Sequence, residues 1–186
     1  MNYDRYINRE YGLGKDFCPS DLVETHSQYK DHVKIRFQVF EAWKQLKEAL
    51  IPLGVELEIE SGYRSYDYQE KVRKECIKEK GIDHAYKYIA KPGHSEHQSG
   101  LAIDYCLKEQ DHYRIEFDIP EEVSKIVEDI AVLYGFILRY PKGKETVTGY
   151  GYEPWHLRYV GQELATYLYK KQITLDEYEK EKESKK

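Results

Sequence analysis

The sequence contains few cysteines, no long apolar run and no excess of positive charge. Its 3 cysteines, Cys18, Cys76 and Cys106, are odd in number and form no CxxC pair, so they predict neither a disulfide framework nor a cysteine zinc cluster. No run approaches the roughly 20 apolar residues of a membrane span, and the N-terminal segment lacks the apolar core of a signal peptide. We therefore expect a cytoplasmic protein, and the sequence leaves open whether an export signal once preceded it.

The balance of charges and the length of the chain bear on its partners and on its number of domains. Lys and Arg total 29 and Asp and Glu total 34, a net charge of -5 that provides no basic stripe for nucleic acid. The 186 residues suffice for one well-cored domain and are too few for two, so a single domain, residues 1–186, is expected. Residues 1–35 lack periodicity and predict an irregular N-terminal arm, whereas residues 172–186 predict a C-terminal helical tail. These patterns leave the oligomeric state open.

Hydrophobic spacing indicates where helices and strands lie. Helical periodicity, ended by proline or glycine, predicts helices over residues 39–51, 66–80, 120–134 and 160–171. Alternating or short apolar runs predict strands over residues 55–60, 99–105 and 136–140, the last continuing through a turn into a returning strand at 146–148. The polar loop 108–118 is expected to border the functional cleft.

The stretch from Lys91 to Asp104 departs from simple packing patterns. Its polar side chains crowd between a Pro-Gly turn and a short apolar strand that carries Asp104 at its end. His97 lies in the loop just before that strand, and small Gly100 and Ala102 leave space on the face that Asp104 shares. Because zinc binds His nitrogen and Asp oxygen, His97 and Asp104 predict half of a zinc site.

The segment 153–156, Glu-Pro-Trp-His, supplies the other half. Pro154 prevents both a regular strand ladder and a helix interior, so a bulged turn is expected to point Glu153 and His156 to one side. His156 then completes a set of three protein ligands. A fourth zinc position left to water is the pattern of a catalytic site, and Glu153 would stand beside that water.

An arginine and a glutamine are predicted to face the same cleft. Arg64 follows a predicted strand and stands close to a glycine, where it can pair with a carboxylate or stabilise a developing oxyanion. Gln69 lies in the first turns of the next predicted helix and is expected on the same side. His94 and Glu96 are expected to surround the zinc ion rather than to bind it.

Two strings of residues together resemble a known family. The VanY / D-alanyl-D-alanine carboxypeptidase family of zinc peptidases has the motifs SxHxxGxAxD and ExxH. The chain resembles this family in Ser-Glu-His97-Gln-Ser-Gly-Leu-Ala-Ile-Asp104 and in Glu153-Pro-Trp-His156. The resemblance extends over residues 61–161, and within the family it is strongest to the cytoplasmic VanXY-type D,D-dipeptidase/D,D-carboxypeptidase.

The resemblance implies a fold and a set of site residues. The fold is a single α+β domain of the hedgehog / D-Ala-D-Ala peptidase kind, with a small central antiparallel sheet that carries the zinc site and helices packed on it. One Zn²⁺ per chain is implied on His97, Asp104 and His156, with Glu153 as general base and Arg64 as the second catalytic residue. Substrate contacts are implied for Arg64, Gln69, Ser95, Tyr140 and Trp155.

The implied function is a zinc-dependent D,D-carboxypeptidase, and also a D,D-dipeptidase, that hydrolyses the terminal D-Ala-D-Ala bond of peptidoglycan precursors. Its partners would be precursor peptides ending in D-Ala, with their free carboxylate bound by Arg64, Ser95 and Gln69. The alternatives are an L,D-carboxypeptidase that removes D-Ala from tetrapeptide stems, a phage endolysin, and a wall-peptide-binding module without turnover. Glu153 argues against the binding module, because binding alone needs no general base.

Overall fold

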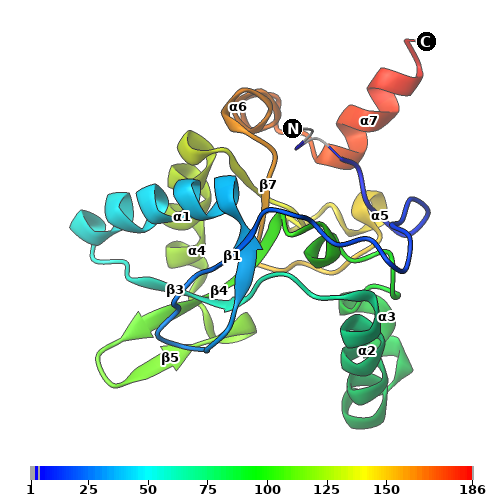
Figure 1. Ribbon diagram of the computed structural model, residues 1–186. Coiled ribbons are helices and arrows are strands. Elements are labelled where there is room, and N and C mark those ends of the chain that lie inside the picture. The colour runs from blue at the N-terminus through cyan, green and yellow to red at the C-terminus, as the bar shows by residue number, and fades with distance from the viewer. Residues whose placement is uncertain (1–2, 4, 186) are drawn as a thin grey trace.

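An antiparallel sheet lies at the centre of the computed structural model, which describes residue 3 and residues 5–185 (Figure 1). Along the sheet, β3, β4, β7 and β6 follow one another, and β5 pairs with the far end of β4. The strands are β3 Leu57–Ser61, β4 Ala102–Glu109, β5 His112–Arg114, β6 Phe136–Leu138 and β7 His156–Tyr159. Because β4 pairs with β3 and β7, it connects the segments from which the site is built.

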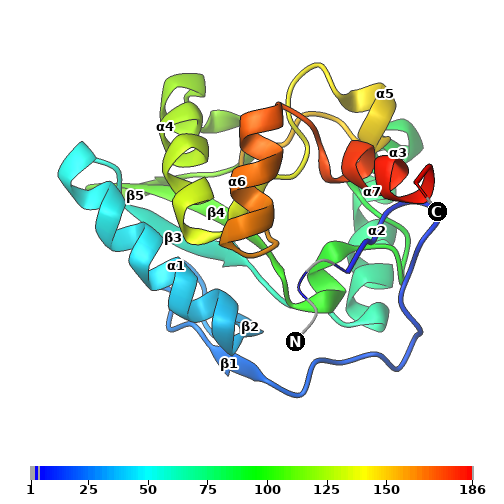
Figure 2. The same cartoon turned by 90° about the horizontal axis from the view of Figure 1, so that it is seen from above.

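Among the described residues, three helices cover one face of this sheet, and two further helices form a separate pair beside it. Figures 1 and 2 show α1, α4 and α6 over the same face, whereas α2 and α3 pack together beside the segment that follows β3. The helices are α1 Phe37–Leu50, α2 Tyr66–Lys80, α3 Ile82–Tyr88, α4 Glu121–Ala131, α5 Glu145–Thr148, α6 Gln162–Lys171 and α7 Leu175–Glu183. Across the described residues, no helix combines the length and the apolar character needed to span a membrane.

The main core lies between the sheet and helices α1 and α4. Leu46 of α1 is buried there together with Ile59 of β3 and with Ile103 and Tyr105 of β4. Side chains alternate between the two faces of a strand, so Asp104 points to the face opposite this core. The apolar pattern of β4 therefore places a carboxylate on the side of the sheet that α1 and α4 leave free.

Several local expectations are wrong. The returning strand predicted at residues 146–148 does not form, because α5 occupies residues 145–148 and β6 pairs with β7 instead. The strand predicted from residue 99 begins at Ala102, because Gly100 has a φ of +68° and ends the 3₁₀ turn Glu96–Ser99. Residues 82–88, for which the sequence patterns above predict no element, form α3.

Short strands also occur in two stretches that were predicted to be irregular. Residues 1–35 contain strand β1 Leu22–Glu24 and the start of β2 Lys34–Arg36, which pair antiparallel in a small separate sheet. The polar loop 108–118 contains the end of β4, all of β5 and the 3₁₀ turn Glu116–Asp118. These strands are too short for an alternating pattern to show in the sequence.

The larger predictions are confirmed. The fold is α+β, with a small antiparallel sheet and helices packed on it. Helix α2 has the predicted bounds because Ser65 caps its first turn, accepting from the amide of Tyr68 at 3.2 Å, and Gly81 ends it. The 3 cysteines are free thiols.

The core assignment predicts a difference between two leucines. Leu46 is 0% exposed, whereas Leu53, just beyond the end of α1, is 51% exposed. We expect Leu46→Ala to lower the free energy of unfolding by about 2 to 5 kcal/mol, because it removes buried methyl groups and leaves a cavity. Leu53→Ala should change it by less than about 0.5 kcal/mol. Urea unfolding followed by circular dichroism measures both, and equal losses would contradict the assignment.

Candidate metal and substrate site

His97 lies at one edge of the site, in the 3₁₀ turn that precedes β4. Its ring is buried, and its Nδ1 lies 2.7 Å from the carbonyl oxygen of Gly62. A carbonyl can only accept, so Nδ1 carries the hydrogen and Nε2 keeps its lone pair. Burial lowers the pKa of His97 to about 4. Burial thus favours the neutral imidazole, which presents Nε2 as the nitrogen of a metal ligand.

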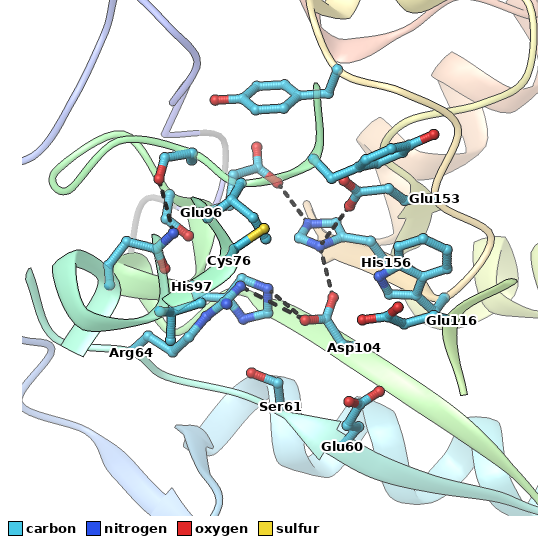
Figure 3. A pocket seen from close by; sticks show the side chains of 18 of the residues that line it. Glu60, Ser61, Arg64, Cys76, Glu96, His97, Asp104, Glu116, Glu153 and His156 are labelled. Atoms are coloured by element: carbon cyan, nitrogen blue, oxygen red, sulfur yellow. Dashed lines mark hydrogen bonds and ion pairs between the residues drawn. The ribbon is translucent and has the colours of Figure 1, made fainter. Parts of the chain in front are cut away.

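Asp104 and His156 face each other because β4 and β7 pair in that register. Oδ1 of Asp104 lies 2.9 Å from Nδ1 of His156, and Oδ2 lies 3.1 Å from Nε2 of His97 (Figure 3). Burial disfavours the Asp104 carboxylate, but the two imidazoles outweigh it and hold its pKa well below its usual range. Burial also opposes protonation of His156, yet Asp104 and Glu96 raise its pKa to about 9. The surroundings of His156 thus favour positive charge.

These three side chains fit a zinc ion. One ligand atom from each lies within 4.8 Å of the other two. Oδ2 of Asp104 lies 3.1 Å from Nε2 of His97 and Oδ1 lies 2.9 Å from Nδ1 of His156. Bonds of about 2.0 to 2.1 Å in a tetrahedral site place ligand atoms roughly 3.3 Å apart, so the carboxylate approaches each imidazole at about the distance between ligands. Nε2 of His97 is buried without a hydrogen-bond partner. No other group of His, Cys, Asp and Glu within the described part of the chain has such an arrangement.

Glu153 lies beside this group, in the turn that leads into β7. Its amide donates to Tyr140 O at 3.1 Å, and the amide of His156 donates to Glu153 O at 3.2 Å. The turn does bring Glu153 and His156 together, with Oε2 3.8 Å from Nδ1. Burial raises the pKa of the Glu153 carboxyl to about 8, although His156 acts in the opposite direction. Such a carboxyl can exchange a proton near neutral pH.

A cavity of about 320 Å³ opens beside these residues. Every residue predicted for the site lines it: Arg64, Gln69, Ser95, His97, Asp104, Tyr140, Glu153, Trp155 and His156. The loop 108–118 borders the cavity through Glu116 and Phe117, as expected. The structure therefore gathers side chains from segments up to 92 positions apart, residues 64 to 156, around one space large enough for a small peptide end.

Arg64 and Gln69 both keep polar atoms without partners. Nη2 of Arg64 lies 3.7 Å from Oδ2 of Asp104, and its buried Nε makes no hydrogen bond. Nε2 of Gln69 donates to the carbonyl oxygen of Ala90 at 3.0 Å, while Oε1 has no partner. Arg64 thus offers donors to an anionic group. Gln69 offers an acceptor, and only the second hydrogen of its Nε2 remains for a carboxylate.

Aromatic side chains form much of the remaining wall. The ring of Tyr140 packs against that of His156 at a tilt of 42°, with centroids 5.0 Å apart. Burial raises the pKa of Tyr140 well above its usual range, so its hydroxyl keeps its proton and can donate. Trp155 packs edge-on against Phe117 at 4.7 Å. Ser95, 4% exposed, completes the side near His97.

Two further features of the site go beyond the sequence predictions, which placed Glu96 near the zinc ion but named none of its partners. Glu60 and Glu116 also line the cavity, and burial raises the pKa of Glu60 to about 7. Behind His156, the buried Glu96 accepts from Arg139 and Arg158. The available signal was an arginine beside apolar residues in each of two short segments, Phe-Ile-Leu-Arg139 and Leu-Arg158-Tyr-Val. A charge in such a place needs a buried partner.

Two histidines and an aspartate beside a buried glutamate form an arrangement suited to metal-assisted hydrolysis. Residues 32–162 match the VanY family, described as D-alanyl-D-alanine carboxypeptidase. The chain belongs to this family, and the resemblance seen in its motifs is confirmed. The matched range includes all residues predicted for the site.

Two relatives are similar over almost the whole chain. VanXYC of Enterococcus gallinarum, a bifunctional D-Ala-D-Ala dipeptidase and D-Ala-D-Ala carboxypeptidase, is 35% identical over 186 residues, covering 96% of this chain and 94% of the relative. YodJ of Bacillus subtilis is 40% identical over 177 residues, covering 92% of this chain. The chain spans 65% of the length of YodJ.

Solved structures show the same fold at substantial sequence identity. The LdcB LD-carboxypeptidase has a TM-score of 0.79 and 38% identity, covering 94% of this chain and 84% of that one. A mutant of the D,D-pentapeptidase VanY from the VanB-type resistance cassette, in complex with Zn(II), has a TM-score of 0.80 and 30% identity. That match covers 95% of this chain and 98% of the other.

The geometry predicts which histidine matters for metal affinity. His97 presents a free Nε2 to Asp104, whereas His94, three positions earlier, has its Nδ1 2.9 Å from the carbonyl oxygen of Asn8. We expect His97→Ala to weaken zinc binding by more than the roughly 10- to 100-fold that is typical of losing an outer partner. His94→Ala should retain the wild-type affinity. Competition with a chromophoric chelator measures both, and wild-type affinity in His97→Ala would contradict the assignment.

Proposed function

We propose that this chain is a zinc-dependent D,D-carboxypeptidase that hydrolyses the terminal D-Ala-D-Ala bond of peptidoglycan precursors and also cleaves the free dipeptide. The observation that carries the proposal is the position of Glu153, buried beside the His97, Asp104 and His156 group in a cavity with an arginine at its wall. The named activities of VanXYC and the Zn(II) held by the VanY structure support it.

The zinc ion would be held by Nε2 of His97, a carboxylate oxygen of Asp104 and Nδ1 of His156. Each of these atoms faces the common centre, since Gly62 O occupies the other nitrogen of His97 and Glu96 lies next to the other nitrogen of His156. When bound, zinc lowers the pKa of water to about 7 and polarises a carbonyl as a Lewis acid.

Glu153 moves the proton in the proposed reaction. Its carboxylate takes a proton from water as the water oxygen adds to the scissile carbonyl carbon. The same carboxyl then gives the proton to the leaving nitrogen as the C–N bond breaks. Its place in the turn before β7 keeps it beside His156, where both transfers would occur.

Arg64 would recognise negative charge on the substrate. Its guanidinium is largely buried, with a donor left unpartnered and only a distant contact with Asp104, 3.7 Å away. A carboxypeptidase must bind a free C-terminal carboxylate, and a guanidinium with Ser95 nearby supplies charge-assisted donors for it. Gln69 can accept an N–H of the substrate through its free Oε1.

An L,D-carboxypeptidase is the second candidate, because LdcB shares 38% identity with this chain. Both activities use a free C-terminal carboxylate and release D-Ala. They differ in the configuration of the residue that precedes the cleaved bond. Side chains along the cavity, rather than the metal group, would decide between them.

Product analysis with three substrates separates these functions. The zinc-loaded protein would be offered D-Ala-D-Ala, a pentapeptide precursor and a tetrapeptide precursor, and released D-Ala would be quantified by chromatography. We expect release from the dipeptide and the pentapeptide. Cleavage of the tetrapeptide alone would assign L,D specificity, and cleavage of none would leave the wall-peptide-binding module as the better proposal.

A conservative change at Glu153 distinguishes catalysis from binding. Glu153→Gln keeps the size of the side chain but cannot accept the proton, so we expect turnover of D-Ala-D-Ala to fall by about 10²- to 10⁴-fold. Zinc affinity should remain within a few-fold of wild type, since Glu153 is not one of the proposed ligands. Steady-state kinetics and chelator competition provide the two measurements. Unchanged turnover would overturn its role as general base.

A further inference from the structure

A cluster of buried charges lies directly behind His156. Nε of Arg139 and Nη1 of Arg158 each donate to the same atom, Oε1 of Glu96, at 2.8 Å. Arg139 also donates to both carboxylate oxygens of Asp176 in α7. All four side chains are at most 2% exposed. Two carboxylates thus balance two guanidiniums, and each guanidinium is fixed by hydrogen bonds as well as by charge.

The inner end of this cluster meets the metal group. Because both arginines use Oε1 of Glu96, its Oε2 is left to face Nε2 of His156 at 3.5 Å (Figure 3). Neither atom has a hydrogen-bond partner, and both are buried. When a metal ion is bound, a hydrogen kept on Nε2 and pointing at Glu96 would leave the Nδ1 lone pair of His156 for the metal, in place of the Nδ1 contact with Asp104. This is the tautomer that a metal ligand at Nδ1 requires.

The outer end of the cluster is held by segments outside residues 32–162, the range that matches the family. Asp176 accepts from the hydroxyl of Tyr6 at 2.8 Å as well as from Arg139. Arg158 reaches the same N-terminal segment and donates through Nη2 to the carbonyl oxygens of Tyr3 and Arg5, at 3.2 and 2.7 Å. A chain of direct contacts therefore runs from α7 through Arg139 and Glu96 to His156.

We propose that Arg139 and Asp176 are positioning residues for the metal site, acting through Glu96 on His156. The inference rests on the proposed function only in taking His156 as a zinc ligand. Stability alone explains the cluster poorly, because burying ion pairs costs desolvation and apolar side chains of similar volume often serve as well. Orientation of a ligand needs a rigid acceptor at a set place, and the fork of Arg139 fixes Glu96 in that way.

Two variants of the outer residues test this inference. Arg139→Lys keeps the charge but loses the planar fork that bridges Glu96 and Asp176, and Asp176→Asn keeps the shape but loses the charge. We expect the zinc dissociation constant to rise about 10-fold in each, the lower end of the range for partners beyond the ligands. The visible absorption of the Co²⁺-substituted protein should also change, because the geometry around His156 changes. Chelator competition and absorption spectra measure these effects at a temperature where circular dichroism shows every variant folded.

The core variant Leu46→Ala is the matched control, because it lowers stability without touching the cluster. It should keep the wild-type zinc affinity and Co²⁺ spectrum. Wild-type affinity in folded Asp176→Asn and Arg139→Lys would overturn the inference, and so would an equal loss of affinity in Leu46→Ala. If Arg139→Lys does not fold, Asp176→Asn decides. A wild-type protein that binds zinc and depends on Asp176 for its affinity, but releases no D-Ala, would overturn the proposed function alone.

Discussion

The register between β4 and β7 is the constraint on which the site depends. It sets Asp104 opposite His156 and places both on the face of the sheet away from α1 and α4. Because side chains alternate, a slip of one residue would turn Asp104 into the apolar core and bring Ile103 to the cavity. The apolar residues that flank Asp104 therefore hold the metal group in place, although none of them touches it.

The site also gives three nearby carboxyl groups three different environments. Glu96 lies between two guanidiniums, which overcome the effect of burial and hold its pKa below its usual range. Asp104 is stabilised as an anion by the two imidazoles. At Glu153 the neighbouring positive groups do not outweigh the effect of burial, which raises its pKa. One small region thus holds two fixed negative charges and one group able to exchange a proton, which is the division of roles that metal-assisted hydrolysis uses.

The sequence allowed the metal group and Glu153 to be predicted because each lies at a point where a regular pattern breaks. Asp104 interrupts the apolar residues of β4, and Pro154 interrupts the approach to β7. The position of α5 could not be predicted in this way. Its residues, Glu-Thr-Val-Thr, include β-branched side chains that favour a strand, but β6 already pairs with β7 and their tendency is overridden.

The pairing of the buried charges behind His156 could not be predicted from local sequence patterns, for another reason. Glu96, Arg139, Arg158 and Asp176 come from four separate segments, so no local pattern indicates which of these charges pair with one another. Only the fold shows that they meet.

The bond between Tyr6 and Asp176 joins positions 170 residues apart in the sequence. Contacts of such long range form late, because the entropy of closing a large loop must be overcome before they contribute stability. The sheet and its core involve much shorter separations, such as that between β6 and β7. Folding would therefore bring the proposed zinc ligands together on the sheet first and fix the orientation of the His156 ring last, so the ability to hold metal tightly would mark the final step of folding rather than its beginning.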